Sequence, residues 1–334
     1  MRNLALVTGG YGFIGKAIVR SLLARGFGVR VLDDGLAPPD FPGGCDVIAA
    51  SVTDPLAVAR ACEGVRWVFH TAGTAHFWAS EPDIFENVNL GGTQIVLQEA
   101  WRQQVERIVH TSSETILPEL DGKLQSDAEL PPLDSMPGPY TSAKWRADAF
   151  AREMSAQGAP IVITYPTAPL GTGDFNGTPP TQMVQMFLDD PPPALLDCAL
   201  NFVSVDDVGE GSVRAAQRGN RGERFILGAH NLSLSDFAQR LHALGGPEPA
   251  TRRIPYPVAR AFASVSEQWA KLLGKTPSVT VEGVALTRKP LWCDTETLEH
   301  RLGLVPRDLD SVLRETMDWL RERNRDDGRR DLAA

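Results

Sequence analysis

Short apolar runs alternate with segments of helical periodicity over the first half of the chain. The apolar runs predict strands at Leu4–Val7, Val29–Leu32, Asp46–Ala50, Trp67–His70, Arg107–Thr111 and Ile161–Tyr165. Apolar residues recur at helical spacing after Ile14 and over the stretches Leu56–Cys62, Asn89–Gln104 and Tyr140–Met154. Strands that alternate with helices favour a parallel sheet built from right-handed crossovers. We therefore predict an α/β fold, a Rossmann-like doubly wound parallel sheet with helices on both faces.

The regular alternation ends after Tyr165. Residues 166–193 are rich in Pro, Gly and Thr, and we expect short strands at Asn201–Val205 and Phe225–Leu227 that return to the sheet. Helical patterns resume over Ser235–Leu244, Val258–Leu273 and Leu309–Arg323. The pattern predicts a parallel-sheet domain of residues 1–165 and 200–228 and a smaller, mainly helical domain of residues 166–199 and 229–320. Residues 321–334 are charged and are expected to form a flexible tail.

Composition and charge narrow the class of protein. The chain has 33 Lys and Arg residues against 42 Asp and Glu, a formal net charge of −9, which argues against a surface for nucleic acid or anionic lipid. No apolar run approaches the roughly 20 residues that span a bilayer, and the strand at Leu4 leaves no room for a signal peptide. The four cysteines are far apart, so neither a zinc site nor a disulfide framework is expected. These features predict a cytoplasmic protein without a metal site.

A glycine-rich turn joins the first strand to the first helix in Thr8-Gly9-Gly10-Tyr11-Gly12-Phe13-Ile14-Gly15. Gly9 allows a tight turn, Gly12 lets the backbone approach a pyrophosphate, and Gly15 allows close packing of helix on strand. The N-terminus of the following helix presents free N–H groups and a partial positive charge to phosphates. Glycine turns are common, but this one has the required strand–turn–helix context, which favours dinucleotide binding over a plain structural turn.

Asp33 ends the second predicted strand, and Asp34 and Gly35 follow it. A carboxylate at this place accepts hydrogen bonds from the adenosine ribose hydroxyls and repels a 2′-phosphate. Because no Lys or Arg directly follows to attract that phosphate, NAD is favoured over NADP. The alternative is that Asp33 and Asp34 only begin a solvated loop.

Tyr140-Thr141-Ser142-Ala143-Lys144 places a tyrosine and a lysine four residues apart, on one face of a predicted helix. A free tyrosine has a pKa of about 10. A neighbouring ammonium and an oxidised nicotinamide both favour the phenolate, so we expect a lowered pKa and a general acid or base at Tyr140. A solvated helix face is the usual explanation of such a string, but here it follows the glycine turn and a strand that ends in Thr111-Ser112-Ser113.

The order of these motifs resembles the extended short-chain dehydrogenase/reductase superfamily, over the chain to about residue 320. The resemblance implies that Ser113 bonds the substrate oxygen and that Tyr140 transfers the proton. It implies that Lys144 holds the nicotinamide ribose and lowers the pKa of Tyr140, and that Asn89 supports the site from a neighbouring helix. It also implies a set of residues that bind NAD, namely Gly9, Tyr11, Gly12, Phe13, Ile14, Gly15, Asp33, Asp34, Ser51, Val52, Thr71, Ala72, Gly73, Thr111, Tyr140, Lys144, Pro166 and Thr167.

Three phrases resemble the dihydroflavonol-reductase-like branch and, within it, the hopanoid-associated members: His76-Phe77-Trp78-Ala79, residues 167–174 and residues 201–207. The segments Val88–Thr93 and Thr111–Ser113 are similar to 3β-hydroxysteroid dehydrogenases. Two positions depart from the pattern of relatives. Ala50-Ser51-Val52 stands where many relatives carry an acid near the adenine. Asp33-Asp34 stands where many reductases of this branch carry a basic residue for NADP, and it is more similar to NAD-using epimerases and dehydrogenases.

The substrate is the least determined part of the prediction. Aromatic and Met side chains suit a bulky, partly apolar substrate, although such residues more often fill a core. The expected pocket walls are His76, Trp78, Glu114, Met183 and Phe187. The resemblance implies an NAD-dependent dehydrogenase or reductase that interconverts a secondary alcohol and a ketone on a sterol, terpenoid, flavonoid or polyketide-like substrate. A homodimer through the helices at residues 89–104 and 140–154 is implied in the same way.

Two alternatives stay open. Glu114 directly follows Ser113, at a place where dehydratases of the superfamily carry acids, which favours a nucleotide-sugar epimerase or dehydratase with tightly bound NAD. Leu200-Asn201 stands where those enzymes usually have an Arg-Asp pair, which counts against them. The other alternative is a cofactor-binding sensor without turnover, although such relatives generally lack the tyrosine or the lysine.

Overall fold

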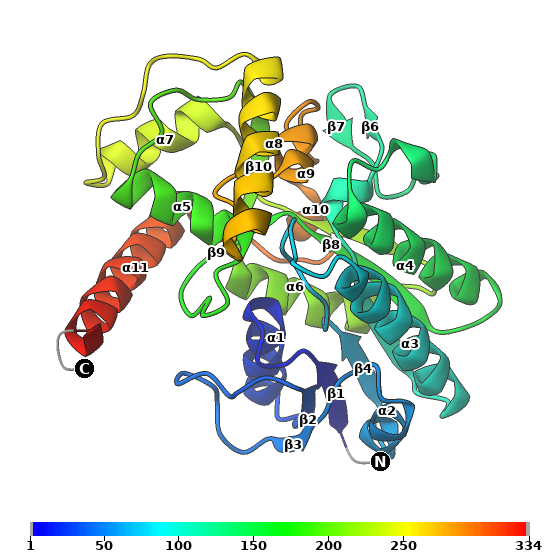
Figure 1. Ribbon diagram of the computed structural model, residues 1–334. Coiled ribbons are helices and arrows are strands. Elements are labelled where there is room, and N and C mark those ends of the chain that lie inside the picture. The colour runs from blue at the N-terminus through cyan, green and yellow to red at the C-terminus, as the bar shows by residue number, and fades with distance from the viewer. Residues whose placement is uncertain (1–2, 332–334) are drawn as a thin grey trace.

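Seven parallel strands form the central sheet, in the order β11-β8-β5-β4-β1-β2-β3 (Figure 1). Their bounds are β1 Leu4–Thr8, β2 Gly28–Asp33, β3 Asp46–Ala49, β4 Trp67–His70, β5 Arg107–Thr111, β8 Ile161–Pro166 and β11 Arg224–Leu227. The computed structural model describes the backbone of residues 3–331 and the side chains of residues 3–325. The predicted doubly wound α/β fold is confirmed. The strand order reverses between β1 and β4, and sheets of this type bind ligands at such a reversal, beyond the carboxyl ends of the strands.

Apolar side chains alternate between the two faces of the sheet, so each face carries its own core. On β1, Ala5 and Val7 pack with helices α1 (Phe13–Ala24) and α6 (Val205–Arg218). Leu6 points the other way and packs with the helices of the opposite face. Those helices are α2 Pro55–Cys62, α3 Thr93–Arg102 and α4 Pro139–Ala156. The sheet is therefore the middle of three layers.

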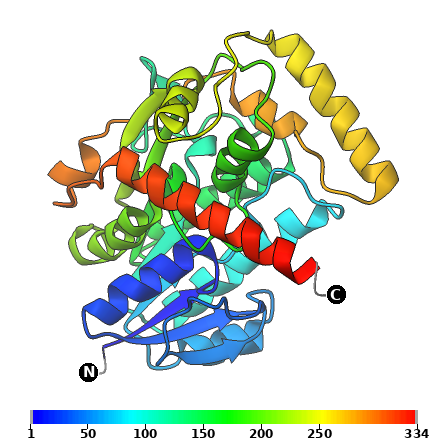
Figure 2. The same cartoon turned by 90° about the vertical axis from the view of Figure 1, so that its left-hand side faces the viewer.

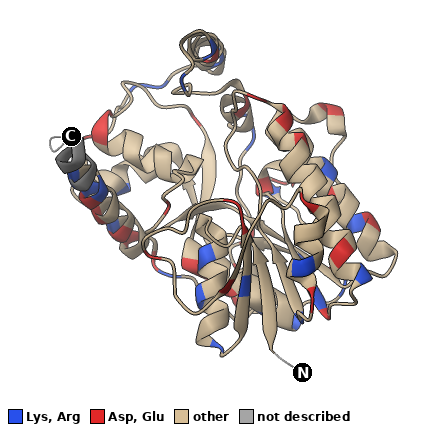
Figure 3. Cartoon of the chain, turned by 60° about the horizontal axis from the view of Figure 1, so that its bottom comes forward, with Lys and Arg blue, Asp and Glu red and all other residues tan. Residues whose placement is uncertain are grey.

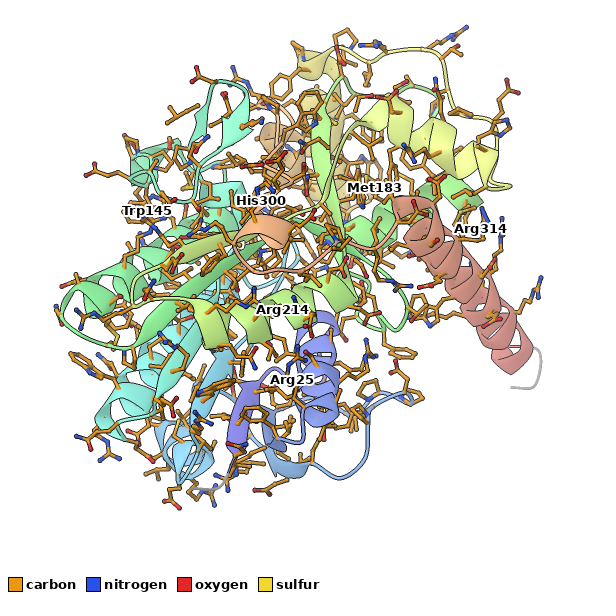
Figure 4. All side chains as sticks on the ribbon, turned by 180° about the vertical axis from the view of Figure 1, so that it is seen from behind. Arg25, Trp145, Met183, Arg214, His300 and Arg314 are labelled. Atoms are coloured by element: carbon orange, nitrogen blue, oxygen red, sulfur yellow. The ribbon has the colours of Figure 1, made fainter. Side chains whose placement is uncertain are left out.

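Helices α1 and α6 lie against each other because a glycine allows the contact and a carboxylate secures it. A Cβ on Gly209 would lie 2.6 Å from the backbone of Ala17, so only glycine fits there. The next residue, Glu210, accepts hydrogen bonds from Arg25 at the C-terminal end of α1 and from Arg214 of α6. Figure 4 labels both arginines. The helix that follows the glycine turn is thereby held in place.

The later part of the chain adds a small mixed sheet and several helices. Strands β9 (Ala168–Leu170), β10 (Ala199–Ser204) and β12 (His230–Ser233) pair in the order β12-β10-β9. The helices around them are α5 Pro179–Asp189, α7 Leu234–Ala243, α8 Tyr256–Leu273, α9 Val281–Leu286 and α11 Leu309–Asp331. Figure 2 shows α11, in red, crossing this side of the molecule, and α8, in gold, at its outer edge. The short elements are η1 Phe85–Gly92, η2 Glu114–Ile116, β6 Glu119–Leu120, β7 Lys123–Leu124, η3 Leu133–Ser135 and α10 Thr297–His300.

Three segments differ from the prediction. The strand expected at Asn201–Val205 does not return to the main sheet: β10 pairs with β9 and β12, because β11 already pairs with the free edge of β8. The single helix expected over Asn89–Gln104 is divided between the π-helical η1 and α3. The segment expected to be flexible from Arg321 onward lies within α11 as far as Asp331, and residues 332–334 lie outside the described residues.

Charged residues lie mainly on the outer helices, whereas the strands of the main sheet carry few of them (Figure 3). Within residues 3–331, no helix combines the length and the apolar character that a membrane crossing requires. The same part of the chain has no group of His, Cys, Asp or Glu residues placed to hold a metal ion. The four cysteines are free thiols.

Candidate active site

Glycine conformations shape the turn between β1 and α1. Gly9 has a φ of 68°, and a Cβ on it would lie 2.7 Å from Ala72 Cα. Gly12 is the N-cap of α1 and offers no side chain to the free N–H groups of the first turn. A Cβ on Gly15 would collide with the carbonyl of Gly9. The turn therefore presents bare backbone and the positive end of a helix dipole to the adjoining cavity, an arrangement that fits a pyrophosphate.

Asp33 lies at the carboxyl end of β2, beside this turn. Its Oδ2 accepts a hydrogen bond from Tyr11 N at 2.9 Å, and its Oδ1 accepts one from Gly35 N at 2.8 Å. These contacts fix the carboxylate next to the glycine turn, where it fits a ribose diol. Asp34 is exposed and lies further from the turn along the same loop.

Asn89 shapes the backbone that follows β4. Its Oδ1 accepts a hydrogen bond from Thr74 N at 2.7 Å, and its Nδ2 donates to Thr74 O at 3.0 Å. A Cβ on Gly73 would lie 2.9 Å from Asn89 Oδ1, so the turn and the buried amide are matched to each other. Asn89 lies in the π-helical η1, a type of helix that is frequent at functional sites. In this structure Asn89 positions the cavity wall.

Ser113 and Tyr140 meet at the wall of the cavity. Tyr140 lies in the first turn of α4, is buried, and shares a hydrogen bond with Ser113, which follows β5. The rings of Phe77 and Phe85 hold the phenol edge-on, with centroids 5.3 and 6.2 Å away. Both Ser113 and Tyr140 line the cavity, so a hydroxyl or carbonyl oxygen placed between them can bond to both.

Lys144 lies one helical turn after Tyr140, and its Nζ donates to Thr111 O at 3.1 Å. Burial lowers the pKa of Lys144 to about 8. The pKa of Tyr140 is raised, not lowered as expected, because burial dominates and the carboxylates of Glu114 and Glu282 also act to raise it. The hydrogen bond from Ser113 opposes this rise only in part. The chain's own groups therefore favour the neutral phenol.

Glu114 is a second titratable group in the cavity wall. Its Oε2 accepts a hydrogen bond from Ser113 Oγ at 3.2 Å, and Ser113 Oγ also lies 2.9 Å from Thr115 Oγ1. Burial raises the pKa of Glu114 to about 7. The ammonium groups of Lys289 and Lys144 oppose that rise weakly.

A buried ionic network fixes the helix that carries Tyr140 and Lys144. Asp148, one turn beyond Lys144, accepts hydrogen bonds from Tyr165 Oη at 2.7 Å and from Arg152 Nε at 2.9 Å. Ser112 Oγ donates to the same carboxylate at 3.2 Å. Because Ser112 follows β5 and Tyr165 belongs to β8, the network ties α4 to the ends of both strands.

A single cavity of about 650 Å³ joins the glycine turn to these side chains. Most of the residues predicted to bind NAD line it, namely Gly9, Gly12, Phe13, Ile14, Gly15, Thr71, Gly73, Tyr140, Pro166 and Thr167. Of the predicted substrate residues, His76, Glu114 and Met183 line it, and Figure 4 labels Met183 on α5. The turn, the carboxylate of Asp33 and the cavity together fit a nicotinamide dinucleotide.

Other predicted residues lie outside the cavity lining. Phe187, predicted as a substrate contact, does not line the cavity: it is buried in the core between α5 and α7, with its ring 6.1 Å from that of Phe237. Trp78 is also outside the lining, and its buried Nε1 has no protein partner. The remaining predicted cofactor residues that do not line the cavity are Tyr11, Asp33, Asp34, Ser51, Val52, Ala72, Thr111 and Lys144.

The structure adds Glu282, which the sequence pattern did not indicate. This buried carboxylate from α9 accepts hydrogen bonds from Thr141 N at 2.7 Å, from Thr141 Oγ1 at 2.6 Å and from Tyr140 N at 3.3 Å. It therefore caps the N-terminus of α4 from a distant segment of the chain, and Gly138 leaves the space for it. No local motif marks such a cap, because donor and acceptor are far apart in sequence.

Lys16 is the second addition. It lies on α1 directly after Gly15, its side chain is fully buried, and its Nζ donates to Asp40 and, at 3.0 Å, to Gly173 O. Its ammonium also lies 5.0 Å from the centre of the Phe175 ring. Lys16 thereby joins the loop after β2 to the loop after β9, around the start of the nucleotide helix.

Comparison with known proteins gives a consistent result. Residues 5–228 match the model of the "NAD dependent epimerase/dehydratase family". The chain is 30% identical over 328 residues to a Synechocystis sp. protein named "Putative dihydroflavonol 4-reductase", which covers 96% of this chain and 95% of the relative. It is 27% identical over 333 residues to sterol demethylase protein B of Methylococcus capsulatus, with coverage of 95% and 98%. The crystal structure of gox2253 matches with a TM-score of 0.83 and 29% identity, over 97% of this chain and 99% of that one.

Proposed function

The chain belongs to the NAD-dependent epimerase/dehydratase family, and we propose that it is an oxidoreductase that interconverts a secondary alcohol and a ketone on a bulky, partly apolar substrate. The observation that carries this proposal is the meeting of Ser113, Tyr140 and the glycine turn in one cavity. An alcohol oxidation needs a proton acceptor beside the reacting carbon and a site for the nicotinamide. In this proposal Tyr140, once deprotonated, is the acceptor, and the end of the cavity beside the glycine turn is the nicotinamide dinucleotide site.

The nicotinamide, when bound, supplies the hydride acceptor for oxidation or the donor for reduction. The backbone of the glycine turn, Asp33 and Lys144 would hold the dinucleotide. Ser113 Oγ orients the substrate oxygen, and Tyr140 Oη takes its proton in oxidation or returns it in reduction. Because the chain's own groups favour the neutral phenol, Tyr140 is poised to donate a proton, and oxidation gains from rising pH.

The cavity lining supports an apolar substrate. Among its described residues none is Lys or Arg, and the only carboxylate is Glu114. The wall away from the glycine turn is mainly apolar, formed by Phe77, Ala168, Pro169, Pro179, Pro180, Met183, Leu200, Leu286 and Leu291. The relatives named for a flavonoid and for a sterol support the same class of substrate.

Glu114 supports a second candidate, a nucleotide-sugar epimerase or dehydratase. A buried carboxyl beside Ser113, with a pKa of about 7, is suited to move a second proton during water elimination. The lack of described cations in the cavity lining counts against a nucleotide-sugar pyrophosphate, which is usually bound by basic groups. We therefore rank this candidate below the alcohol oxidoreductase.

The preference for NAD over NADP is part of the proposal. Asp33 places a carboxylate beside the glycine turn, where a 2′-phosphate would be repelled. No Lys or Arg follows Asp33 directly to offset this repulsion.

The proposal is tested with a panel of secondary alcohols of increasing apolar bulk, incubated with the protein and either NAD or NADP. The absorbance of reduced nicotinamide reports oxidation. We expect turnover to rise with apolar bulk, and we expect Tyr140→Phe to reduce kcat by about 100- to 10,000-fold while NAD still binds. Oxidation of UDP- or dTDP-sugars, or their dehydration, with no activity on simple apolar alcohols would instead support the second candidate.

A further inference from the structure

Helix α8 carries an apolar stripe that the rest of the protein does not cover. The stripe consists of large side chains that are each more than half exposed: Val258, Phe262, Val265, Trp269, Leu272 and Leu273. Spacings of four and three residues place them on one side of the helix. The adjoining side carries the buried Ala259 and Ala263, which pack with Val284 of α9. In Figure 2 the stripe's helix forms the outer edge of the molecule, with α9 on its inner side.

No other element described in the structure bears such a stripe. The remaining exposed large apolar side chains are scattered, with Leu36 on a loop, Leu56 on α2 and Leu120 on β6 as examples. Single exposed apolar residues are normal. A continuous row of them instead marks a surface that contacts another protein or a membrane.

The charge around the stripe favours a membrane over another protein as its partner. The chain as a whole has a net charge of −9, but residues 251–290 contain seven Lys and Arg residues and only two acids. One of those acids, Glu282, is buried at the N-terminus of α4. The exposed cations near the stripe include Arg260, Lys271 and Lys275. A helix with Trp, Phe and Leu on one side and Lys and Arg on its polar side is typical of one that lies in a membrane interface.

A second copy of the chain is a poorer match for the stripe. When two helices pair through a row of apolar residues, the positions on either side of that row, called the seam, carry complementary charges. The positions beside this stripe are Ala261, Ser266 and Gln268, which supply none. The bulky Phe262 and Trp269 occupy the seam itself, where branched aliphatic side chains pack better.

We infer that the α8 stripe docks this protein on the surface of an anionic lipid membrane, with α8 lying in the plane of the interface. Its length of 18 residues and its one-sided apolar character suit that position, whereas no described helix could span the bilayer. The net charge of −9 over the whole chain argued against a surface for anionic lipid, because it does not show that residues 251–290 are locally basic.

The position of the stripe connects the membrane to the cavity. Helix α9, on which α8 packs, contributes Gly283 and Leu286 to the cavity lining, and Thr287 at its C-terminal end contributes too. An apolar alcohol dissolved in the lipid would then have a short path to Tyr140. This connection, unlike the docking itself, rests on the proposed function.

Vesicle co-sedimentation of the full chain tests the docking. The vesicles contain phosphatidylcholine alone or phosphatidylcholine with phosphatidylglycerol. We expect binding to the anionic vesicles, weakened by salt, and a loss of about tenfold or more in Phe262→Gln/Trp269→Gln/Leu272→Gln and in Lys271→Glu/Lys275→Glu. The matched control Leu56→Gln/Arg60→Glu on α2 changes one exposed apolar residue and one exposed cation, and it should bind like the wild type.

Thermal unfolding and sedimentation velocity accompany these measurements. Because the substituted side chains are exposed, we expect unchanged unfolding temperatures and an unchanged oligomeric state. Equal vesicle binding by the stripe variant and the wild type overturns the inference, and so does an absence of binding by the wild type. If the stripe variant instead dissociates an oligomer, the surface is an interface between copies, and the inference is wrong.

A second readout separates docking from catalysis. The stripe variant should lose oxidation of a vesicle-dissolved sterol but keep oxidation of a water-soluble secondary alcohol. If the wild type oxidises neither alcohol yet binds vesicles in the predicted way, the proposed function fails while the docking stands.

Discussion

Burial decides the protonation of the reactive side chains. Tyr140, Lys144 and Glu114 are each shifted toward the neutral form, and in each the largest cause is loss of water around the group. The motif predicted the proximity of Tyr140 and Lys144 but not this outcome, because a spacing of four residues carries no information on burial.

Glu114 gives a pH dependence of stability with a definite sign. Its pKa rises from 4.5 to about 7 on folding, so the folded state holds the proton more tightly than the unfolded state. The associated stability is fully present below pH 4.5 and is lost as the pH rises through about 7, by up to about 3 kcal/mol. Denaturant unfolding at pH 5 and pH 8 should show this loss in the wild type and not in Glu114→Gln.

The exposed Glu322→Gln on α11 serves as the control for Glu114→Gln and should retain the wild-type pH dependence. Parallel pH profiles for Glu114→Gln and the wild type would show that Glu114 does not titrate in this range.

Asp33 makes the cofactor preference testable. Removal of its carboxylate in Asp33→Ala takes away both the ribose acceptor and the repulsion of a 2′-phosphate. We expect kcat/KM with NAD to fall by roughly 10- to 100-fold and the ratio of NAD to NADP activity to fall with it. Asp34→Ala, on the exposed neighbour, should change the ratio less. Comparable activity with both cofactors in the wild type would refute the role of Asp33.

At the scale of elements, the sequence pattern predicted the positions of strands well, because these depend on neighbouring residues, but it did not predict how the later strands pair. The expected strands at Trp67–His70 and Arg107–Thr111 coincide with β4 and β5, because their apolar runs are bounded by clear turn signals. The partner of β10 could not be predicted in the same way. Strand pairing depends on which edge is free in three dimensions, and β10 pairs with β9, a strand of three residues that the pattern did not indicate.

The cap of α4 belongs to the same class of long-range features. Glu282 reaches from α9 to the backbone of Tyr140 and Thr141, so the element that lines the substrate cavity also holds the first turn of the helix that carries Tyr140. Its carboxylate also helps to raise the pKa of Tyr140.

Glu282→Gln should therefore lower kcat and move the rising limb of the pH–rate profile for oxidation, which reports the deprotonation of Tyr140, toward lower pH. The neutral amide removes a charge that raises the pKa of Tyr140, and it has one acceptor oxygen for donors that two oxygens now serve. Glu267→Gln is the matched control, because Glu267 bonds to Val281 N at the start of α9 without contacting α4. A shift of equal size in both variants, or in neither, would contradict a specific role for Glu282.

For the whole molecule, the cavity lies where the two parts of the chain meet. The strand ends and the glycine turn supply one wall, and α5 and α9 supply the other. Sequence reasoning placed the first wall well, because its residues follow strands in a known order. It also expected Phe187 in the second wall. Phe187 lies one turn after Met183 on the same side of α5, but it packs in the core, and of the two only Met183 lines the cavity.

A substitution of Lys16 tests how far the stability of the glycine-turn region depends on its contact with the loop after β9. Lys16→Met removes the ammonium that joins Asp40 to Gly173 O. Because Asp40 is partly exposed, we expect a loss of about 1–3 kcal/mol in the free energy of unfolding, with weaker NAD binding. Arg20→Met, on the same helix but in exposed ion pairs, should cost less than about 1 kcal/mol. Equal losses of unfolding free energy in the two variants would mean that the buried contact of Lys16 stabilises the protein no more than an exposed ion pair does.

The most direct test of the central claim follows an isotope. A secondary alcohol with deuterium on its carbinol carbon is incubated with NAD and the protein, and the deuterium content of the nicotinamide ring is measured. We predict transfer to the ring by the wild type and transfer at least about 100-fold slower by Tyr140→Phe with unchanged NAD affinity. Transfer by Tyr140→Phe at the wild-type rate, or release of the deuterium to water by the wild type, would contradict the account.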